Sequence, residues 1–153
     1  MKIQTAYSLH NGEGEWRKRE LLEWVSELFN APGIIVAPGS TGKIRDYIRD
    51  GLQQAGWAHS VRIEPTFDLT VTGIYRDLAF QIQTGNVSRA MYDLIKMEYL
   101  YRKNKIEATA LAVPTKSAAE IIGSNIANVD RLWSEIQLFD RIITVPILLL
   151  AFE

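Results

Sequence analysis

The sequence predicts an α/β fold in which helices flank a mixed β-sheet. Two neighbouring stretches, 68–72 and 78–83, alternate polar and apolar residues, which is typical of half-buried strands. Two later stretches, 108–113 and 142–152, are almost continuously apolar, as in strands covered on both faces. Apolar residues recur at helical spacing in the stretches 15–29, 44–54, 87–103 and 118–139, the last interrupted near 123–125. This order favours an antiparallel hairpin joined to parallel crossovers.

The composition limits which kinds of protein and which kinds of functional site the chain can form. The chain has 153 residues, of which 47% are hydrophobic, so we expect a single domain over residues 1–153. The absence of cysteine excludes thiolate metal sites, and two histidines, His10 and His59, are too few for a histidine-rich zinc site. The formal net charge is −1, so nucleic-acid binding would depend on a local basic patch.

The sequence also bears on location. No basic and then apolar leader opens the chain. No apolar run approaches the ~20 residues that a membrane-spanning helix needs. We therefore expect a cytoplasmic protein without a membrane partner.

The first third of the chain reads as strand, helix, strand and helix. Residues 1–8 predict a strand, 15–29 a helix with one apolar stripe, and 33–37 a short buried strand. The glycine-rich loop 38–43 then leads into the next helix; it lacks the spacing of an ATP-binding loop. Free N–H groups at a helix start attract phosphate oxygens, which makes Lys43 a candidate DNA contact. A simple helix cap is the alternative.

Residues 66–86 predict a hairpin whose turn lies at Gly73. Side chains two residues apart share one face of a strand. The face of interest presents Asp68, Thr70 and Thr72 from the first strand and Ala79, Gln81 and Gln83 from the second. One carboxylate and two carboxamides therefore converge, as in a functional site. A plain polar sheet face is the alternative.

The helix after the hairpin carries a basic and aromatic stripe, made of Arg89, Tyr92, Lys96, Tyr99 and Lys103. Such a stripe suits contact with a DNA backbone, although solvated charged faces are also common. A further lysine follows the apolar strand 108–113. The candidate DNA contacts are thus Lys43, Arg89, Lys96, Lys103 and Lys116.

In the order of its short motifs, the chain resembles type II restriction endonucleases of the BglII type, within the PD-(D/E)xK nuclease superfamily. That superfamily has an Asp on the first strand of a hairpin and an acid-x-Lys triplet on the second. The BglII branch ends the triplet with Gln, as at Gln83 here. Further matching positions are Met1 to Ile3, Tyr7, His10, Pro38, Gly39, Asp46 to Asp50, Trp57, Phe67, Asp68, Thr115, Lys116, Phe139, Asp140 and Val145 to Ile147.

The resemblance implies a restriction-endonuclease-like core and Mg²⁺-dependent hydrolysis of phosphodiester bonds in double-stranded DNA, by a homodimer. Carried over to this chain, the catalytic residues are Asp68, Gln81 and Gln83. The metal ligands are Asp68, Gln81 and the carbonyl of Ile82. In such a site the metal ion polarises the phosphate and activates a water molecule.

The triplet departs from the family at Gln81, where the family has Glu. The family's Asp is also nearer to that Glu than Asp68 is to Gln81. Three interpretations remain open: the acid has moved to Asp93 or Glu98 on the next helix, the protein binds DNA without cleaving it, or Gln81 is an introduced isosteric replacement. A non-catalytic DNA-binding or protein-interaction module on the same fold is therefore the alternative function.

Overall fold

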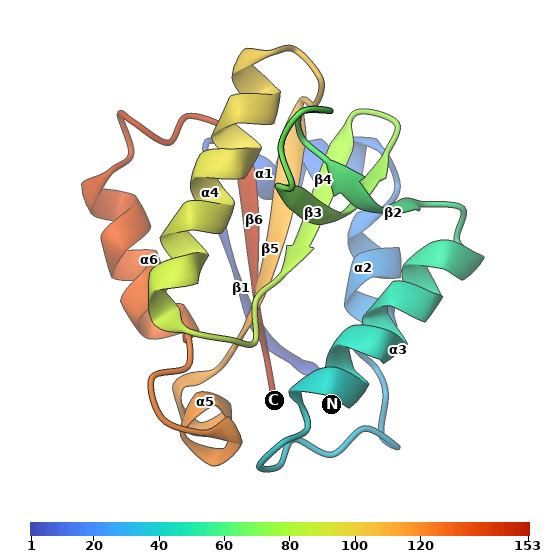
Figure 1. Cartoon of the computed structure of the whole chain (residues 1–153), viewed down its shortest axis with the longest axis vertical. Coiled ribbons are helices and arrows are strands. Elements are labelled where there is room, and N and C mark those ends of the chain that lie inside the picture. The colour runs from blue at the N-terminus through green and yellow to red at the C-terminus, as the bar shows by residue number, and fades with distance from the viewer.

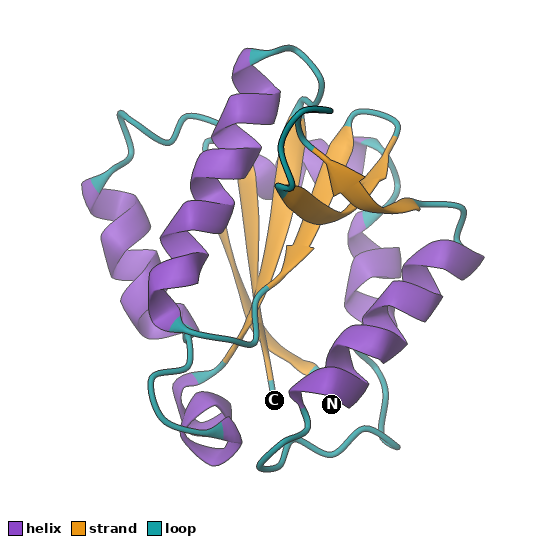
Figure 2. Cartoon of the chain, viewed as in Figure 1, coloured by secondary structure: helices purple, strands orange, loops and turns teal.

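The computed structural model describes residues 1–153, which form a six-stranded mixed sheet with helices on both faces (Figures 1 and 2). The strands are β1 (Ile3–Leu9), β2 (Ala58–Arg62), β3 (Thr70–Tyr75), β4 (Leu78–Ile82), β5 (Ala108–Pro114) and β6 (Ile147–Phe152). The helices are α1 (Gly12–Lys18), α2 (Leu22–Leu28), α3 (Thr41–Gln54), α4 (Val87–Arg102), α5 (Lys116–Ile122) and α6 (Val129–Leu138). None of these helices combines the length and apolarity that crossing a membrane requires.

The sheet has the order β1-β6-β5-β4-β3-β2. Its three central strands β4, β5 and β6 run parallel, and the outer pairs β1–β6, β2–β3 and β3–β4 are antiparallel. The helical crossover α4 joins β4 to β5, while α5 and α6 join β5 to β6. The predicted α/β class with a mixed sheet is confirmed.

Two apolar clusters pack on opposite faces of the sheet, and they explain why the central strands are apolar throughout. Along β4 and β5, Ala79 and Leu111 face one cluster, and Phe80 and Ala110 face the other. The first cluster includes α4 and α6, and the second includes α1, α2 and α3, as the two sides of the sheet in Figure 1 show. Each large side chain buried in this way contributes about 1.5–3 kcal/mol.

The predicted N-terminal helix over 15–29 is wrong, because the chain forms two short helices there. The break comes at Glu20, whose φ of 60° lies in the left-handed region. Arg19, which ends α1, forms ion pairs with Glu15 and with Asp77 in the β3–β4 turn. The turn is thereby fastened to the end of α1, and the chain changes direction before α2 begins.

The predicted strand over 33–37 is also wrong, since this segment adds no strand to the sheet. Ile35 in its middle is 77% exposed, so its apolar sequence does not mark a buried strand. The sheet instead ends on this side with β2, a largely exposed strand for which the sequence analysis predicts no element. Partners distant in sequence, and not local hydrophobicity, decide which segment pairs.

The hairpin turn lies at Arg76 and Asp77, and not at Gly73 as predicted. Gly73 lies within β3, opposite Phe80. A Cβ at Gly73 would lie 3.3 Å from Leu52 and 3.4 Å from Trp57, so glycine permits their close packing. The last strand is shorter than predicted, because it begins at Ile147.

Substitution of Gly12, at the start of α1, tests how closely α1 packs against the start of β6. A Cβ at Gly12 would overlap the backbone of Ile147 at the start of β6. We expect Gly12→Ala to lower the free energy of unfolding by about 1–3 kcal/mol or more, because backbone cannot yield as a side chain can. Gly42 in the first turn of α3 has nothing within 4 Å of such a Cβ. Gly42→Ala should therefore stabilise by about 0.5–1 kcal/mol, with urea denaturation measuring both.

Candidate functional site

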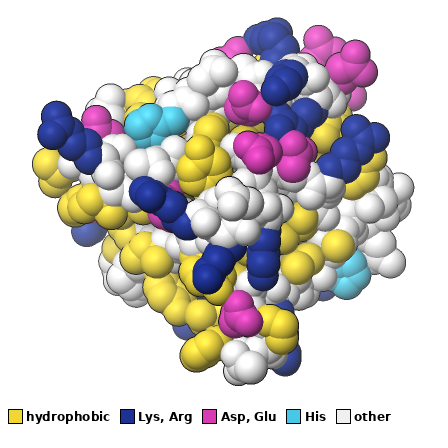
Figure 3. Space-filling model, turned by 90° about the horizontal axis from the view of Figure 1, so that it is seen from above, with side chains coloured by type: hydrophobic (Ala, Val, Ile, Leu, Met, Phe, Trp, Pro, Cys, Tyr) yellow, Lys and Arg dark blue, Asp and Glu magenta, His cyan; other side chains and the backbone are white.

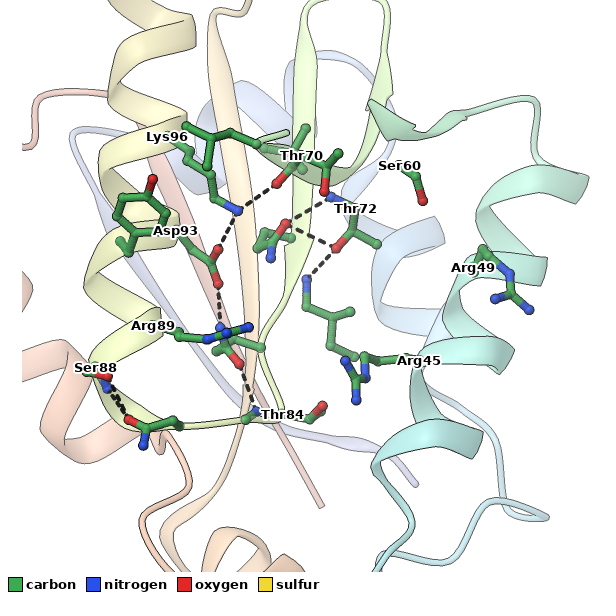
Figure 4. A pocket seen from close by; sticks show the side chains of 18 of the residues that line it. Arg45, Arg49, Ser60, Thr70, Thr72, Thr84, Ser88, Arg89, Asp93 and Lys96 are labelled. Atoms are coloured by element: carbon green, nitrogen blue, oxygen red, sulfur yellow. Dashed lines mark hydrogen bonds and ion pairs between the residues drawn. The ribbon is translucent and has the colours of Figure 1, made fainter. Parts of the chain in front are cut away.

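A cleft of about 1040 Å³ lies between α3 and α4, beside the β3–β4 hairpin (Figure 4). It exists because β3 pairs with β4 only from Gly73 to Tyr75, opposite Leu78 to Phe80. Before Gly73, β3 departs from β4 and leaves the end of β4 open. The polar residues that line the cleft are Arg45, Arg49, Ser60, Asp68, Thr70, Thr72, Gln81, Gln83, Thr84, Asn86, Ser88, Arg89, Tyr92, Asp93 and Lys96.

The cleft is positively charged although the whole chain carries −1. Arg45 and Arg49 lie on α3, and Arg89 and Lys96 lie on α4. The only acidic side chains in the lining are those of Asp68 and Asp93. On the face seen in Figure 3, by contrast, basic and acidic side chains are interspersed.

Gln81 and Thr72 form a closed neutral pair at the floor of the cleft. The Oε1 of Gln81 accepts hydrogen bonds from the backbone N–H of Thr72 at 2.9 Å and from its hydroxyl at 3.1 Å. The backbone N–H of Ile82 in turn donates to Thr72 Oγ1 at 3.2 Å. These bonds join the two strands where the backbone ladder has ended. They also show that Thr72 is the residue that faces Gln81.

A second, charged network lies beside this pair. Gln83 Nε2 donates to Asp93 Oδ2 at 2.6 Å, and Gln83 Oε1 accepts from the backbone N–H of Gly85 at 2.7 Å. Lys96 Nζ lies 2.7 Å from Asp93 Oδ1 and donates to the carbonyl of Thr70 at 2.6 Å. Figure 4 shows the resulting chain of contacts from α4 to both strands of the hairpin. Both carboxylate oxygens of Asp93 and both polar atoms of the Gln83 carboxamide therefore have a partner.

Asp68 does not lie where the sequence analysis expected it, because β3 begins two residues later, at Thr70. Its side chain is 90% exposed at the rim of the cleft, with Oδ1 3.6 Å from Arg62 Nη2. The hairpin register places Thr72, and not Asp68, opposite Gln81. The assignment of Asp68, Gln81 and Gln83 as catalytic residues stays a prediction.

The two candidate migrated acids lie in different places. Asp93 is buried in the cleft, whereas Glu98 lies outside its lining. The Glu98 carboxylate accepts hydrogen bonds from the backbone N–H groups of Thr144 and Val145, at 2.7 and 2.8 Å, and pairs with Arg102. Glu98 thus connects α4 to the segment before β6, and the structure does not bring it to Gln81.

The predicted basic contacts also divide into two groups. Arg89 and Lys96 line the cleft, but Lys43, Lys103 and Lys116 do not. Lys103 lies over the ring of Tyr99, whose hydroxyl donates to Glu64 at 2.8 Å, so this end of the stripe is occupied by intramolecular contacts. The sequence analysis missed Arg45 and Arg49; their spacing of four residues on one helix was the available signal.

The residues of the cleft do not fit a Mg²⁺ ion. Mg²⁺ prefers carboxylate and other hard oxygen ligands in octahedral geometry. The two facing positions of the hairpin carry a hydroxyl and a carboxamide, Thr72 and Gln81, whose oxygens already accept hydrogen bonds. The buried carboxylate of Asp93 is paired with Lys96. No group of three or more His, Cys, Asp or Glu side chains anywhere in the chain is placed to hold a metal ion.

The family model of restriction endonuclease BglII/BglIII matches residues 6–152. The chain belongs to this family. A crystal structure of restriction endonuclease BglII complexed with a DNA 16-mer has a TM-score of 0.80 and 17% identity, over 100% of this chain and 78% of that chain. A structure of free BglII has a TM-score of 0.74 and 17% identity, over 100% of this chain and 80% of that one. No curated protein matches the sequence.

These comparisons confirm the resemblance and the restriction-endonuclease-like fold that it implied. They do not assign roles to individual residues, which have to be argued from the geometry of the cleft. In that geometry Gln83 contacts Asp93, neutral residues occupy the two facing hairpin positions, and α4 contributes a buried ion pair.

Glu98 gives a prediction for the pH dependence of stability. Burial raises the pKa of Glu98, but hydrogen bonds from Arg102, Val145 and Thr144 outweigh it and hold the pKa below its ordinary value. A lowered pKa contributes stability that is present above the ordinary glutamate pKa and is lost as the pH falls through the folded-state pKa. We expect Glu98→Gln to cost about 1.5–3 kcal/mol at neutral pH, and less in acid. Urea denaturation across the acid range checks this; a cost that does not change with pH would contradict it.

The facing pair Thr72 and Gln81 gives a second prediction. In Thr72→Asp/Gln81→Glu two carboxylates would meet, so the variant should lose stability by charge repulsion and regain it with Mn²⁺. Thermal denaturation should show a Tm increase of roughly 2–4 °C for each kcal/mol of Mn²⁺ binding. Thr66→Asp/Gln53→Glu is the matched control, because it changes the charge equally at exposed positions outside the cleft. Equal responses of the two variants to Mn²⁺ would show that residues 72 and 81 do not share an ion.

Proposed function

We propose that the cleft between α3 and α4 binds double-stranded DNA through its phosphate backbone. The observation that carries this proposal is the presence of four basic side chains, Arg45, Arg49, Arg89 and Lys96, in the lining of one cleft in a chain of net charge −1. Arg49 and Lys96 pair with aspartates, whereas Arg45 and Arg89 form no ion pair. Membership of a restriction endonuclease family supports it, as does the similarity of the fold to BglII in a structure with DNA.

The two walls of the cleft suit this role. Figure 4 shows Arg45 on α3 and Arg89 on α4 at opposite walls of the cleft, so that a backbone lying between the helices would meet a guanidinium group on each side. Arg49, one turn further along α3, forms ion pairs with Asp46 and Asp50. Guanidinium groups bind phosphate through paired N–H donors, and such contacts fix position more than sequence. The cleft therefore accounts for affinity, and the sequence that the protein prefers depends on other contacts.

We also propose that the protein acts as a homodimer. Two copies related by a two-fold axis would present two clefts to the two strands of a duplex, whose backbones have the same symmetry. Sedimentation of the protein with and without duplex DNA measures the number of copies. A single copy on each duplex would contradict this part of the proposal.

Mg²⁺-dependent hydrolysis of phosphodiester bonds in double-stranded DNA is the second candidate function. One observation favours it: Asp93 is hydrogen-bonded to Gln83 of the triplet, as an acid that had moved to the helix would be. The pairing of Asp93 with Lys96 disfavours it. Incubation of plasmid DNA with Mg²⁺ or Mn²⁺ discriminates the two functions, since a binding protein leaves the plasmid intact.

The DNA-binding proposal predicts a steep dependence of affinity on salt, because each neutralised phosphate releases counterions. Arg89→Gln should weaken binding to every duplex and reduce the slope of log K against log salt by about 0.9 for one lost contact. Arg131→Gln is the control; Arg131 is exposed on α6, pairs with Glu135 and lies outside the cleft. Fluorescence anisotropy with a labelled duplex measures both. A flat salt response of the unaltered protein would contradict DNA binding.

A further inference from the structure

The cleft contains an ammonium group that is almost completely withdrawn from solvent. Lys96 is 8% exposed and its partner Asp93 is 4% exposed. Lysine and aspartate are rarely buried to this extent unless they are paired, because removal of a charge from water is costly. Replacing such a pair by apolar residues is often neutral or stabilising, so stability alone does not explain its presence.

The ion pair between Asp93 and Lys96 connects three parts of the fold, namely α4 and the two strands of the hairpin at its open end. Asp93 is bonded to Gln83 just after β4, and Lys96 is bonded to Thr70 at the start of β3. Beside it, Thr72 and Gln81 are neutral and bonded to each other. A metal ion held by carboxylates from two strands would join the same elements. Two carboxylates with one divalent ion carry no net charge, and neither does Asp93 with Lys96.

We propose that the Lys96 ammonium is the cleft's own cation and takes the place of a divalent metal ion, so that DNA binding needs no metal. This inference rests on the proposed DNA binding. An ammonium has three N–H donors, and Asp93 Oδ1 and the Thr70 carbonyl account for two. The third has no partner in the structure, and because Lys96 lines the cleft we expect this donor to meet a phosphate oxygen when DNA binds.

The same arrangement opposes binding of a divalent ion. Asp93 is the one buried carboxylate of the cleft, and Lys96 Nζ lies 2.7 Å from its Oδ1. An ion that shared this carboxylate would meet a like charge a few ångströms away in a partly desolvated site, where repulsion between charges is strong. The ammonium and a divalent ion therefore exclude each other at this carboxylate, and in this chain Lys96 occupies the place.

The test compares binding of a labelled duplex in EDTA and in MgCl₂ at matched ionic strength, by fluorescence anisotropy of the full chain. We expect equal affinity in the two buffers. The variant Asp93→Asn/Lys96→Gln removes both charges together and so avoids a lone buried charge; it should bind roughly tenfold more weakly, as expected for one lost charged hydrogen bond. Lys96→Arg keeps the charge and should retain more of the affinity.

Arg102→Gln is the matched control. Arg102 also lies on α4 in an ion pair, with Glu98, but outside the cleft, so its loss should leave affinity unchanged. Binding that appears only with Mg²⁺ would overturn the inference and leave DNA binding in place. An unchanged affinity of the Asp93→Asn/Lys96→Gln variant would also overturn it. Absence of binding in both buffers would overturn the proposed function and the inference with it. The comparison of buffers needs no variant, so it tests the independence of a metal ion even if the variants do not fold; Lys96→Arg, which keeps the buried ion pair, then tests the role of the ammonium.

Discussion

Gly73 lies opposite Phe80, and this register of the β3–β4 hairpin decides which side chains meet in the cleft. Glycine suits this register, because Leu52 and Trp57 lie 3.3 and 3.4 Å from where a Cβ would be. From it follows the pairing of Thr72 with Gln81 and the early divergence of β3 from β4. The cleft and its floor thus follow from how the two strands of the hairpin pair.

The cleft and the fold meet different electrostatic demands. The sheet is held by apolar contacts on both faces, which require no charge. The cleft contains a buried ion pair, whose desolvation is costly, together with exposed arginines. The proposed binding of a polyanion is a role that these charges fit. The neutral Thr72–Gln81 pair fits the same proposal, because it adds no negative charge to the cleft.

The elements that are buried on one or both sides could be predicted from the sequence. Strands whose place in the sheet depends on a partner elsewhere in the chain could not. The apolar strands β5 and β6 and the helix α4 were recognisable because local periodicity reports burial on one or both sides. β2 was not recognised, since an exposed edge strand has no apolar signature and depends on β3 for its hydrogen bonds. In the cleft, Gln81, Gln83, Asp93 and Lys96 could be named from the sequence. Which of them touch depends on the register and on the rotation of α4, neither of which a linear pattern contains.

The network of Gln83, Asp93 and Lys96 also has a kinetic meaning. Its hydrogen bonds and ion pair hold these three side chains in one arrangement in the free protein. Side chains that are already ordered lose little conformational entropy when a partner arrives, so the cleft is preorganised. Complexes of such a surface form without waiting for a rearrangement, and the differences between good and poor partners then appear in how long each complex lasts. If the cleft binds DNA as proposed, the time that the protein stays on each site is the quantity that distinguishes one site from another.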